Sequence, residues 1–327
     1  MKKLINAIDT VLAESLDGFA SAHGDLVMLG DERKFVRRRA LNPQKVALVS
    51  GGGSGHEPLH AGFVGRGMLD AACPGQVFTS PTPDQIVEAA AAVGGNAGVL
   101  FIVKNYAGDR MNFEMAAELY EGKAMSVVTN DDVAVEKSTH SEGRRGVAGT
   151  LVVEKIVGAA AEKGMDLKLC AELAADVNAR TRSIGVALTS CTVPAAGTPT
   201  FTLGEDEIEM GVGIHGEPGR KRMKLGSADE VAEQMVGAIL GDYEGGASGH
   251  ALLLVNGFGG TPSIELYLMY NAARRILEKR GVSVARSLVG SYVTSLEMAG
   301  CSISLTMLDD NLTALWDGPV HTASLRW

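Results

Sequence analysis

The sequence contains few cysteines, and their spacing excludes the common cysteine motifs. The 327 residues include only Cys73, Cys170, Cys191 and Cys301, with no Cys-x-x-Cys pair. A zinc site is therefore not expected, and neither is a disulfide framework. Scattered cysteines behave as small apolar side chains and are typical of proteins in a reducing compartment. The sequence thus predicts a cytoplasmic protein.

Basic residues are also scarce relative to acidic ones. The chain has 30 lysines and arginines against 39 aspartates and glutamates, a formal net charge of −9. Because no basic run stands out either, nucleic acids and anionic membranes are not expected partners. A field of this sign does not attract phosphate, so any phosphate chemistry must rely on local groups.

The sequence lacks a long apolar segment. Its longest uncharged run, 183–204, is rich in Thr, Ser, Pro and Gly, which indicates strand and loop instead of a membrane span. The opening Met-Lys-Lys suggests a signal peptide, but Asn6, Asp9 and Glu14 interrupt any apolar core for one. No association with a membrane is expected.

Several familiar glycine and histidine motifs are incomplete. The segment Ser50-Gly-Gly-Gly-Ser-Gly-His-Glu-Pro58 lacks the Gly-Lys-Ser/Thr ending of a phosphate-binding P-loop. It also has His56 where the dinucleotide fingerprint requires a third glycine, which argues against a dehydrogenase. His56 and His60 are four residues apart, but they do not form the His-Glu-x-x-His arrangement of a zinc protease. No metal ligands are predicted.

What the chain does have is a regular alternation of strands and helices. Apolar segments predict strands at 45–50, 98–103, 125–128, 184–188, 207–214, 251–255, 282–289 and 302–308. Helical spacing and capping residues predict helices at 2–16, 147–163, 166–179 and 261–281, and helices that begin at Thr82 and Ser227. Alternation of this kind is typical of α/β architecture. Near residue 182 the pattern changes from two successive helices to strands joined by a Pro/Gly-rich link. This change predicts two domains, 1–182 and 183–327.

Three loops could carry chemistry. The glycines at 51–55 follow one strand, and Lys104 and Asp109 follow another; ligands of α/β sheets bind at such strand ends. Lys104 could donate to a hydroxyl or carbonyl and Asp109 could accept a proton, but Asp109 could equally be a helix cap. His215 lies in Gly-Val-Gly-Ile-His-Gly-Glu-Pro-Gly, where an imidazole could act as base, nucleophile or metal ligand.

The sequence resembles the substrate-binding K subunit of dihydroxyacetone kinases over nearly all of its length. The most specific matching stretches are 50–58, 72–83, 104–109, 143–147, 191–197 and 211–219. The segment 219–250 departs from the commonest members of that family. The resemblance implies two α/β domains with the active site between them, in a homodimer.

The resemblance also implies the residues of the site. It places the family's covalent histidine at His215, which adds to the ketone carbon of dihydroxyacetone and forms a hemiaminal. The family's catalytic pair falls on His56 and Asp109. Its substrate contacts fall on Gly53, Ser54, Gly55 and Lys104 together with the three catalytic residues.

No segment of the sequence resembles a nucleotide-binding site. The resemblance implies that phosphate comes from a separate L subunit carrying a magnesium nucleotide, with either ATP or a phosphotransferase-system protein as the donor. Two alternatives stay open: another short ketose such as erythrulose could be the substrate, or the chain could be a non-catalytic ketose-binding co-regulator of transcription. Retention of His56, Asp109 and His215 favours the enzyme.

Overall fold

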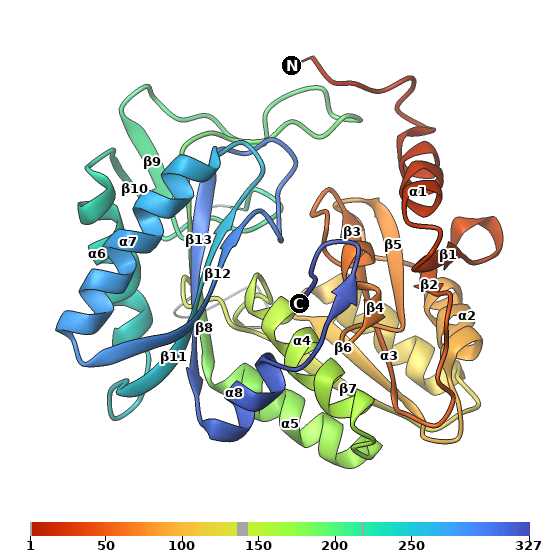
Figure 1. Ribbon diagram of the computed structural model, residues 1–327. Helices are drawn as coiled ribbons and strands as arrows, with labels where there is room; N and C mark the ends of the chain where they lie inside the picture. Colours follow the sequence, from red (N-terminus) through yellow and green to blue (C-terminus); the bar gives the residue numbers. More distant parts are fainter. Residues whose placement is uncertain (1, 136–142, 218) are drawn as a thin grey trace. The chain divides into compact units, whose positions relative to one another are not determined.

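The computed structural model describes residues 2–135, 143–217 and 219–327 and divides into two compact units (Figure 1). Unit 1 comprises Met1–Thr129, Thr150–Val177 and Ala314–Trp327, and unit 2 comprises Asn130–Gly149 and Asn178–Thr313. The boundary expected at 182 lies near one crossing, at 177/178. The chain also crosses at 129/130, 149/150 and 313/314. Composition does not mark these other crossings.

Unit 1 is built on a six-stranded sheet of order β1-β2-β5-β3-β6-β7. The strands are β1 (Val27–Leu29), β2 (Val36–Arg38), β3 (Ala47–Ser54), β5 (Ala71–Val77), β6 (Val99–Lys104) and β7 (Ala124–Thr129). The pairs β5-β3, β3-β6 and β6-β7 are parallel, whereas β1-β2 and β2-β5 are antiparallel. A small second sheet pairs β4 (Gly65–Arg66) with β14 (His321–Thr322).

Helices bury both faces of this sheet. The helices are α1 (Val11–Ala22), α2 (Pro83–Val93), α3 (Ala107–Leu119), α4 (Gly149–Glu162), α5 (Leu167–Ala179) and α8 (Asp310–Trp316), with 3₁₀ turns at Asp31–Arg33 and Ala61–Phe63. Thr82 and Gln85 form the predicted capping box of α2. Alternate side chains of β3 and β6, such as Val49 and Phe101, pack with α2 and α3 in one apolar core. The intervening residues therefore point to the opposite face.

Unit 2 has a mixed sheet of order β10-β9-β8-β13-β11-β12. Its strands are β8 (Thr181–Ala187), β9 (Glu207–Met210), β10 (Lys221–Lys224), β11 (Gly249–Gly257), β12 (Val282–Gly290) and β13 (Gly300–Leu308), and only β11-β12 is a parallel pair. Helices α6 (Ala228–Gly241) and α7 (Ser263–Lys279) pack on the sheet around one apolar core (Figure 1). The α/β class predicted from the sequence is confirmed.

Two predicted elements have different bounds. The first helix begins at Val11, so Leu4 and Ile8 precede it and are exposed instead of forming its apolar face. The strand predicted at 45–50 continues through the glycines to Ser54, because it pairs with β5 along that whole length. None of the helices in the described ranges is long and apolar enough to cross a bilayer.

Candidate functional site

The glycine-rich segment of unit 1 lies at the carboxyl end of β3, beside the end of its parallel neighbour β6. Glycine is required there by close neighbours. A Cβ at Gly51 would lie 2.6 Å from the backbone oxygen of Cys73, and one at Gly53 would lie 2.6 Å from the backbone nitrogen of Thr79. A Cβ at Gly52 would lie only 2.1 Å from Nζ of Lys104. These glycines therefore admit protein groups to the strand end.

Lys104 ends β6 with its side chain completely buried. Its Nζ lies 3.2 Å from the Gly51 carbonyl oxygen, 3.0 Å from His60 Nε2 and 3.4 Å from Asp109 Oδ2. A buried ammonium is tolerated only where acceptors replace its water shell. The end of β6 thus carries a fixed cation at the edge where ligands of α/β sheets bind.

Asp109 lies in the first turn of α3 and is buried. The N-cap of α3 is Tyr106, so the alternative that Asp109 caps the helix is excluded. The positive end of the helix dipole favours a carboxylate at this position, and Lys104 lies beside it. Its placement agrees with a role as proton acceptor.

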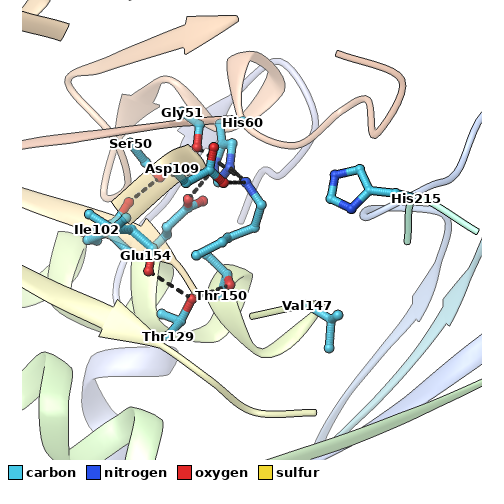
Figure 2. Close-up of polar contacts among 12 residues, drawn as sticks. Ser50, Gly51, His60, Ile102, Asp109, Thr129, Val147, Thr150, Glu154 and His215 are labelled. Carbon is cyan, nitrogen blue, oxygen red and sulfur yellow. Dashed lines mark hydrogen bonds and ion pairs between the residues drawn. The ribbon is translucent and has the colours of Figure 1, made fainter. Parts of the chain in front are cut away.

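A second chain of buried contacts joins Glu154, His60 and Ser50 (Figure 2). His60 Nδ1 lies 2.6 Å from Glu154 Oε1 and 3.1 Å from Ser50 Oγ, and the Ser50 hydroxyl donates to the Ile102 carbonyl at 2.7 Å. Burial, then the charges of Lys104 and His56, hold the pKa of His60 well below its usual range. His60 is therefore neutral at pH 7.

His56 stacks its ring on Phe78, with centroids 5.0 Å apart and an interplanar angle of 14°. It is 1% exposed. The neighbouring Ser54 hydroxyl donates to the Gly75 carbonyl at 2.7 Å, and the Gly55 N–H donates to the Glu57 carboxylate at 2.9 Å. Burial raises the pKa of Glu57. Ser54 and Gly55 thus make hydrogen bonds within the protein.

His215 belongs to unit 2, where Glu217 holds it by two contacts. Glu217 Oε1 lies 2.9 Å from His215 Nδ1, and Oε2 accepts the His215 backbone N–H at 3.0 Å. Desolvation opposes ionisation of Glu217, but His215 and the Arg145 guanidinium outweigh it and lower its pKa to about 2. Pro218, within the predicted loop 211–219, lies outside the described residues.

The glycines around His215 make room for this carboxylate. A Cβ at Gly213 would lie 1.9 Å from Glu217 Oε2. Gly216 has φ +77°, a conformation that side chains other than glycine rarely adopt. The Glu217 carboxylate accepts a hydrogen from Nδ1, so whenever the His215 ring is neutral its lone pair is on Nε2. The contact with Glu217 therefore sets which ring nitrogen of a neutral His215 carries the hydrogen.

A cavity in unit 1 is a different feature. It has a volume of about 410 Å³ and lies between α1 and β3, with Leu16 and Phe19 in its wall. Gly53, Ser54 and His60 line it, whereas His56, Lys104 and Asp109 do not. Small polyols offer little apolar surface, so their recognition depends on polar groups. We therefore place the candidate site at the polar cluster, not in this cavity.

The predicted site residues divide between the units. Unit 1 contains Gly53, Ser54, Gly55, His56, Lys104 and Asp109, and it joins Lys104 to Asp109 directly. His215 is described within unit 2 alone. Nowhere in the described ranges do three or more His, Cys, Asp or Glu side chains gather as metal ligands would.

Sequence reasoning missed Ser50, Glu154 and Glu217, and it weighed His60 only as a metal ligand. One signal for Glu154 was present. Glu154 and Lys155 are adjacent charged residues in the middle of an apolar helical segment, Leu151-Val-Val-Glu-Lys-Ile-Val157. Both are completely buried. Charged residues are almost never fully buried unless they are paired, so such a pair marks a buried polar network.

Comparison with known proteins identifies the family. The Dak1 domain matches residues 17–324. The chain belongs to the Dak1 family. It is 49% identical over its whole length, and over 99% of the relative, to the "PEP-dependent dihydroxyacetone kinase, dihydroxyacetone-binding subunit DhaK" of Escherichia coli.

Two further relatives bear on the choice of substrate and donor. A "PTS-dependent dihydroxyacetone kinase 1, dihydroxyacetone-binding subunit DhaK" of Listeria innocua is 50% identical over 95% of each chain. The "D-erythrulose kinase" of Mycolicibacterium smegmatis is 38% identical over the whole chain, which spans 57% of that relative.

Solved structures show the same fold. The "Dihydroxyacetone kinase operon co-activator Dha-DhaQ" matches with a TM-score of 0.90 and 33% identity, covering 95% of this chain and 97% of that one. The dihydroxyacetone kinase from C. freundii in complex with AMP-PNP and Mg²⁺ matches with a TM-score of 0.89 and 34% identity, covering 99% of this chain and 61% of that one.

Proposed function

We propose that this chain is the dihydroxyacetone-binding subunit of a cytoplasmic dihydroxyacetone kinase. The observation that supports this best is the near-half identity to the E. coli subunit along the whole of both chains. The buried cluster of Lys104 and Asp109 adds a chemical reason, because it offers a cation and a carboxylate suited to hydroxyl groups.

His215 supplies the covalent step of the proposal. Its Nε2 lone pair adds to the ketone carbon as the C=O π bond breaks, and the carbonyl oxygen takes up a proton from water and becomes a hydroxyl. Loss of the Nδ1 hydrogen then leaves the neutral hemiaminal. Positive charge develops on the imidazole as the bond forms, and the Glu217 carboxylate beside Nδ1 stabilises it. Because glycerol has no carbonyl group, this bond selects ketoses over glycerol.

Asp109 and His56 serve the transfer of phosphate. In the proposal Asp109 accepts the proton of the attacking terminal hydroxyl, with assistance from His56. Lys104 stabilises the Asp109 carboxylate and orients the oxygens of the bound ketose. Transfer of a phosphoryl group depends mainly on positioning and charge stabilisation, which fits a site built from fixed charges.

We propose that the phosphate comes from an L-type subunit carrying a magnesium nucleotide, recharged by a phosphotransferase-system protein. The wording "PEP-dependent" and "PTS-dependent" in the names of the relatives supports this donor over free ATP. We also propose a homodimer. Three exposed apolar side chains at helical spacing on α3, Met111, Met115 and Leu119, offer a surface for a second copy.

Two alternatives have specific support. The erythrulose kinase relative favours a four-carbon ketose in the same covalent site. The co-activator structure, similar at a TM-score of 0.90, favours a ketose-binding regulator. The higher identity to kinase subunits argues for the enzyme.

The test reconstitutes the reaction in parts. The purified chain is mixed with each ketose and its intact mass is measured by native mass spectrometry; light scattering gives its oligomeric state. We expect a mass increase with dihydroxyacetone that the His215→Ala variant loses.

Phosphate transfer should need an added L subunit. The Asp109→Asn variant should capture ketose but transfer phosphate at least 100-fold more slowly. Rapid turnover by the chain alone with ATP would refute the partner requirement, and capture without transfer would favour the regulator.

A further inference from the structure

The Lys104 ammonium has two hydrogen-bond partners and one carboxylate beside it as an ion-pair partner. The hydrogen-bond partners are the Gly51 carbonyl at 3.2 Å and His60 Nε2 at 3.0 Å, and the ion-pair partner is Asp109 Oδ2 at 3.4 Å. The contact with Asp109 is the longest of the three. The two hydrogen bonds therefore fix the position of the ammonium, and the Gly51 carbonyl and His60 hold it beside Asp109.

Hydrogen counting determines the tautomer of His60. The Ser50 hydroxyl has one hydrogen, which goes to the Ile102 carbonyl. At its 3.1 Å contact with His60 Nδ1, Ser50 must then accept, so Nδ1 carries the ring hydrogen. Nε2 is left with the lone pair that receives the Lys104 hydrogen. In the opposite tautomer an N–H would face the ammonium.

Glu154 holds that tautomer in place. It projects from α4, is completely buried, and its Oε1 lies 2.6 Å from His60 Nδ1 (Figure 2). Burial raises the pKa of Glu154 to about 8 despite the nearby charge of Lys104. In either protonation state Oε1 can accept the His60 hydrogen. Within the described part of the chain, Oε2 has no hydrogen-bond partner.

We propose that His60 and Glu154 are positioning residues that hold the Lys104 ammonium against Asp109 for phosphate transfer. The chain of contacts is Glu154 Oε1, His60 Nδ1, His60 Nε2, Lys104 Nζ and Asp109 Oδ2, and every member is buried. This assignment rests on the proposed function and names two residues that act through Lys104. Within the described ranges, neither His60 nor Glu154 forms a hydrogen bond or ion pair with Asp109.

Burial of the Glu154 carboxyl group costs free energy, because the group loses its contacts with water. An apolar residue of the same size would fit α4, whose other residues at 151–157 are apolar except Lys155. A purely structural role would require only that the buried groups pair. The positioning role requires in addition that loss of the pair slows transfer more than it weakens binding.

The test compares three variants in the complete system of chain, L subunit and donor. Glu154→Leu removes the acceptor for His60, Glu154→Gln keeps it, and Thr150→Val removes an equally buried hydrogen bond one turn earlier on α4, to Thr129. We expect Glu154→Leu to lower kcat by about 10- to 100-fold, since small displacements at a reacting site have effects of this size. Ketose capture on His215 should change little. Glu154→Gln should restore most of the rate, and Thr150→Val should retain it.

Equal losses of kcat in Glu154→Leu and Thr150→Val, or an unchanged kcat in Glu154→Leu, would overturn the proposal. Should Glu154→Leu not fold, ¹⁵N NMR of histidine-labelled wild-type protein decides: we expect hydrogen on Nδ1 of His60, and hydrogen on Nε2 would refute the assignment. Failure of the proposed function looks different. In that case the wild-type protein itself neither captures ketose nor transfers phosphate.

Discussion

At the scale of single residues, two glycines occupy positions where a charged group from elsewhere in the same unit fills the space of a side chain. The Lys104 ammonium lies against Gly52, and the Glu217 carboxylate lies against Gly213. The sequence drew attention to both glycine clusters as places where a ligand could approach. The space beside Gly52 and Gly213 is instead occupied by charged groups of the protein itself, the Lys104 ammonium and the Glu217 carboxylate.

Gly52→Ala is expected to impair transfer more than folding. The new Cβ would meet the end of a lysine side chain, which can move, so the ammonium is displaced and the strand is kept. We expect kcat to fall by about tenfold or more, with a small change in melting temperature. Gly51→Ala is the contrast, because its Cβ would meet the Cys73 backbone and should destabilise the fold. Gly237→Ala, which has open space, is the control. Retained activity in Gly52→Ala would argue against a fixed ammonium.

Glu217→Gln is expected to weaken ketose capture. The amide still accepts the Nδ1 hydrogen of His215 but cannot neutralise the charge that develops on the ring. Hydrogen bonds to charged groups contribute about 1.5–3 kcal/mol, so we expect capture to weaken by about tenfold or more. Native mass spectrometry of the intact protein with ketose measures it. Glu278→Gln on α7 serves as a surface control, and identical capture by both variants would exclude this role for Glu217.

At the scale of elements, helix α6 depends on its capping box. The Ser227 side chain accepts the Glu230 N–H at 3.3 Å, and the Glu230 carboxylate accepts the Ser227 N–H at 2.7 Å. Ser227→Ala should lower the free energy of unfolding by about 1 kcal/mol. Ser227→Asp should keep most of it, because aspartate also caps helices. Urea denaturation measures both, and equal losses in the two variants would contradict the capping explanation.

Element boundaries were predictable where the signal is local. The capping residues Thr82 and Ser227 and the apolar run of β6 each indicated an element that the structure contains. The extension of β3 through Gly53 was not predictable, since pairing with β5 overrides the low strand preference of glycine. Contacts such as His60 with Glu154 join residues 94 positions apart, so no local pattern encodes them.

At the scale of the whole molecule, stability should depend on pH through Glu154. Its pKa is about 8 in the folded protein and near 4.5 in an unfolded chain, so the folded state binds its proton more tightly. The stability from that proton is complete below about pH 4.5 and is lost as the pH rises through 8. Glu154→Gln lacks this proton. Its free energy of unfolding, relative to wild type, should therefore increase between pH 5 and pH 9.

Urea denaturation at several pH values measures this difference. Groups that titrate equally in both proteins, such as Asp132 and Glu217, cancel from it. The groups that face Glu154 and Lys104, namely His60, His56 and Asp109, remain in both proteins. A constant difference across this range would show that Glu154 titrates normally.

The return of residues 314–327 to unit 1 constrains the order of events during synthesis. These residues supply β14, the partner of β4, and the Leu315 carbonyl that accepts from the buried Lys155 ammonium. The rings of Trp316 and Trp327 also lie 5.9 and 5.4 Å from that ammonium. Domains usually fold in order as the ribosome makes them. Here the first unit to be started is the last to be completed, and a nascent chain must carry Lys155 without its partners until all of unit 2 has been translated.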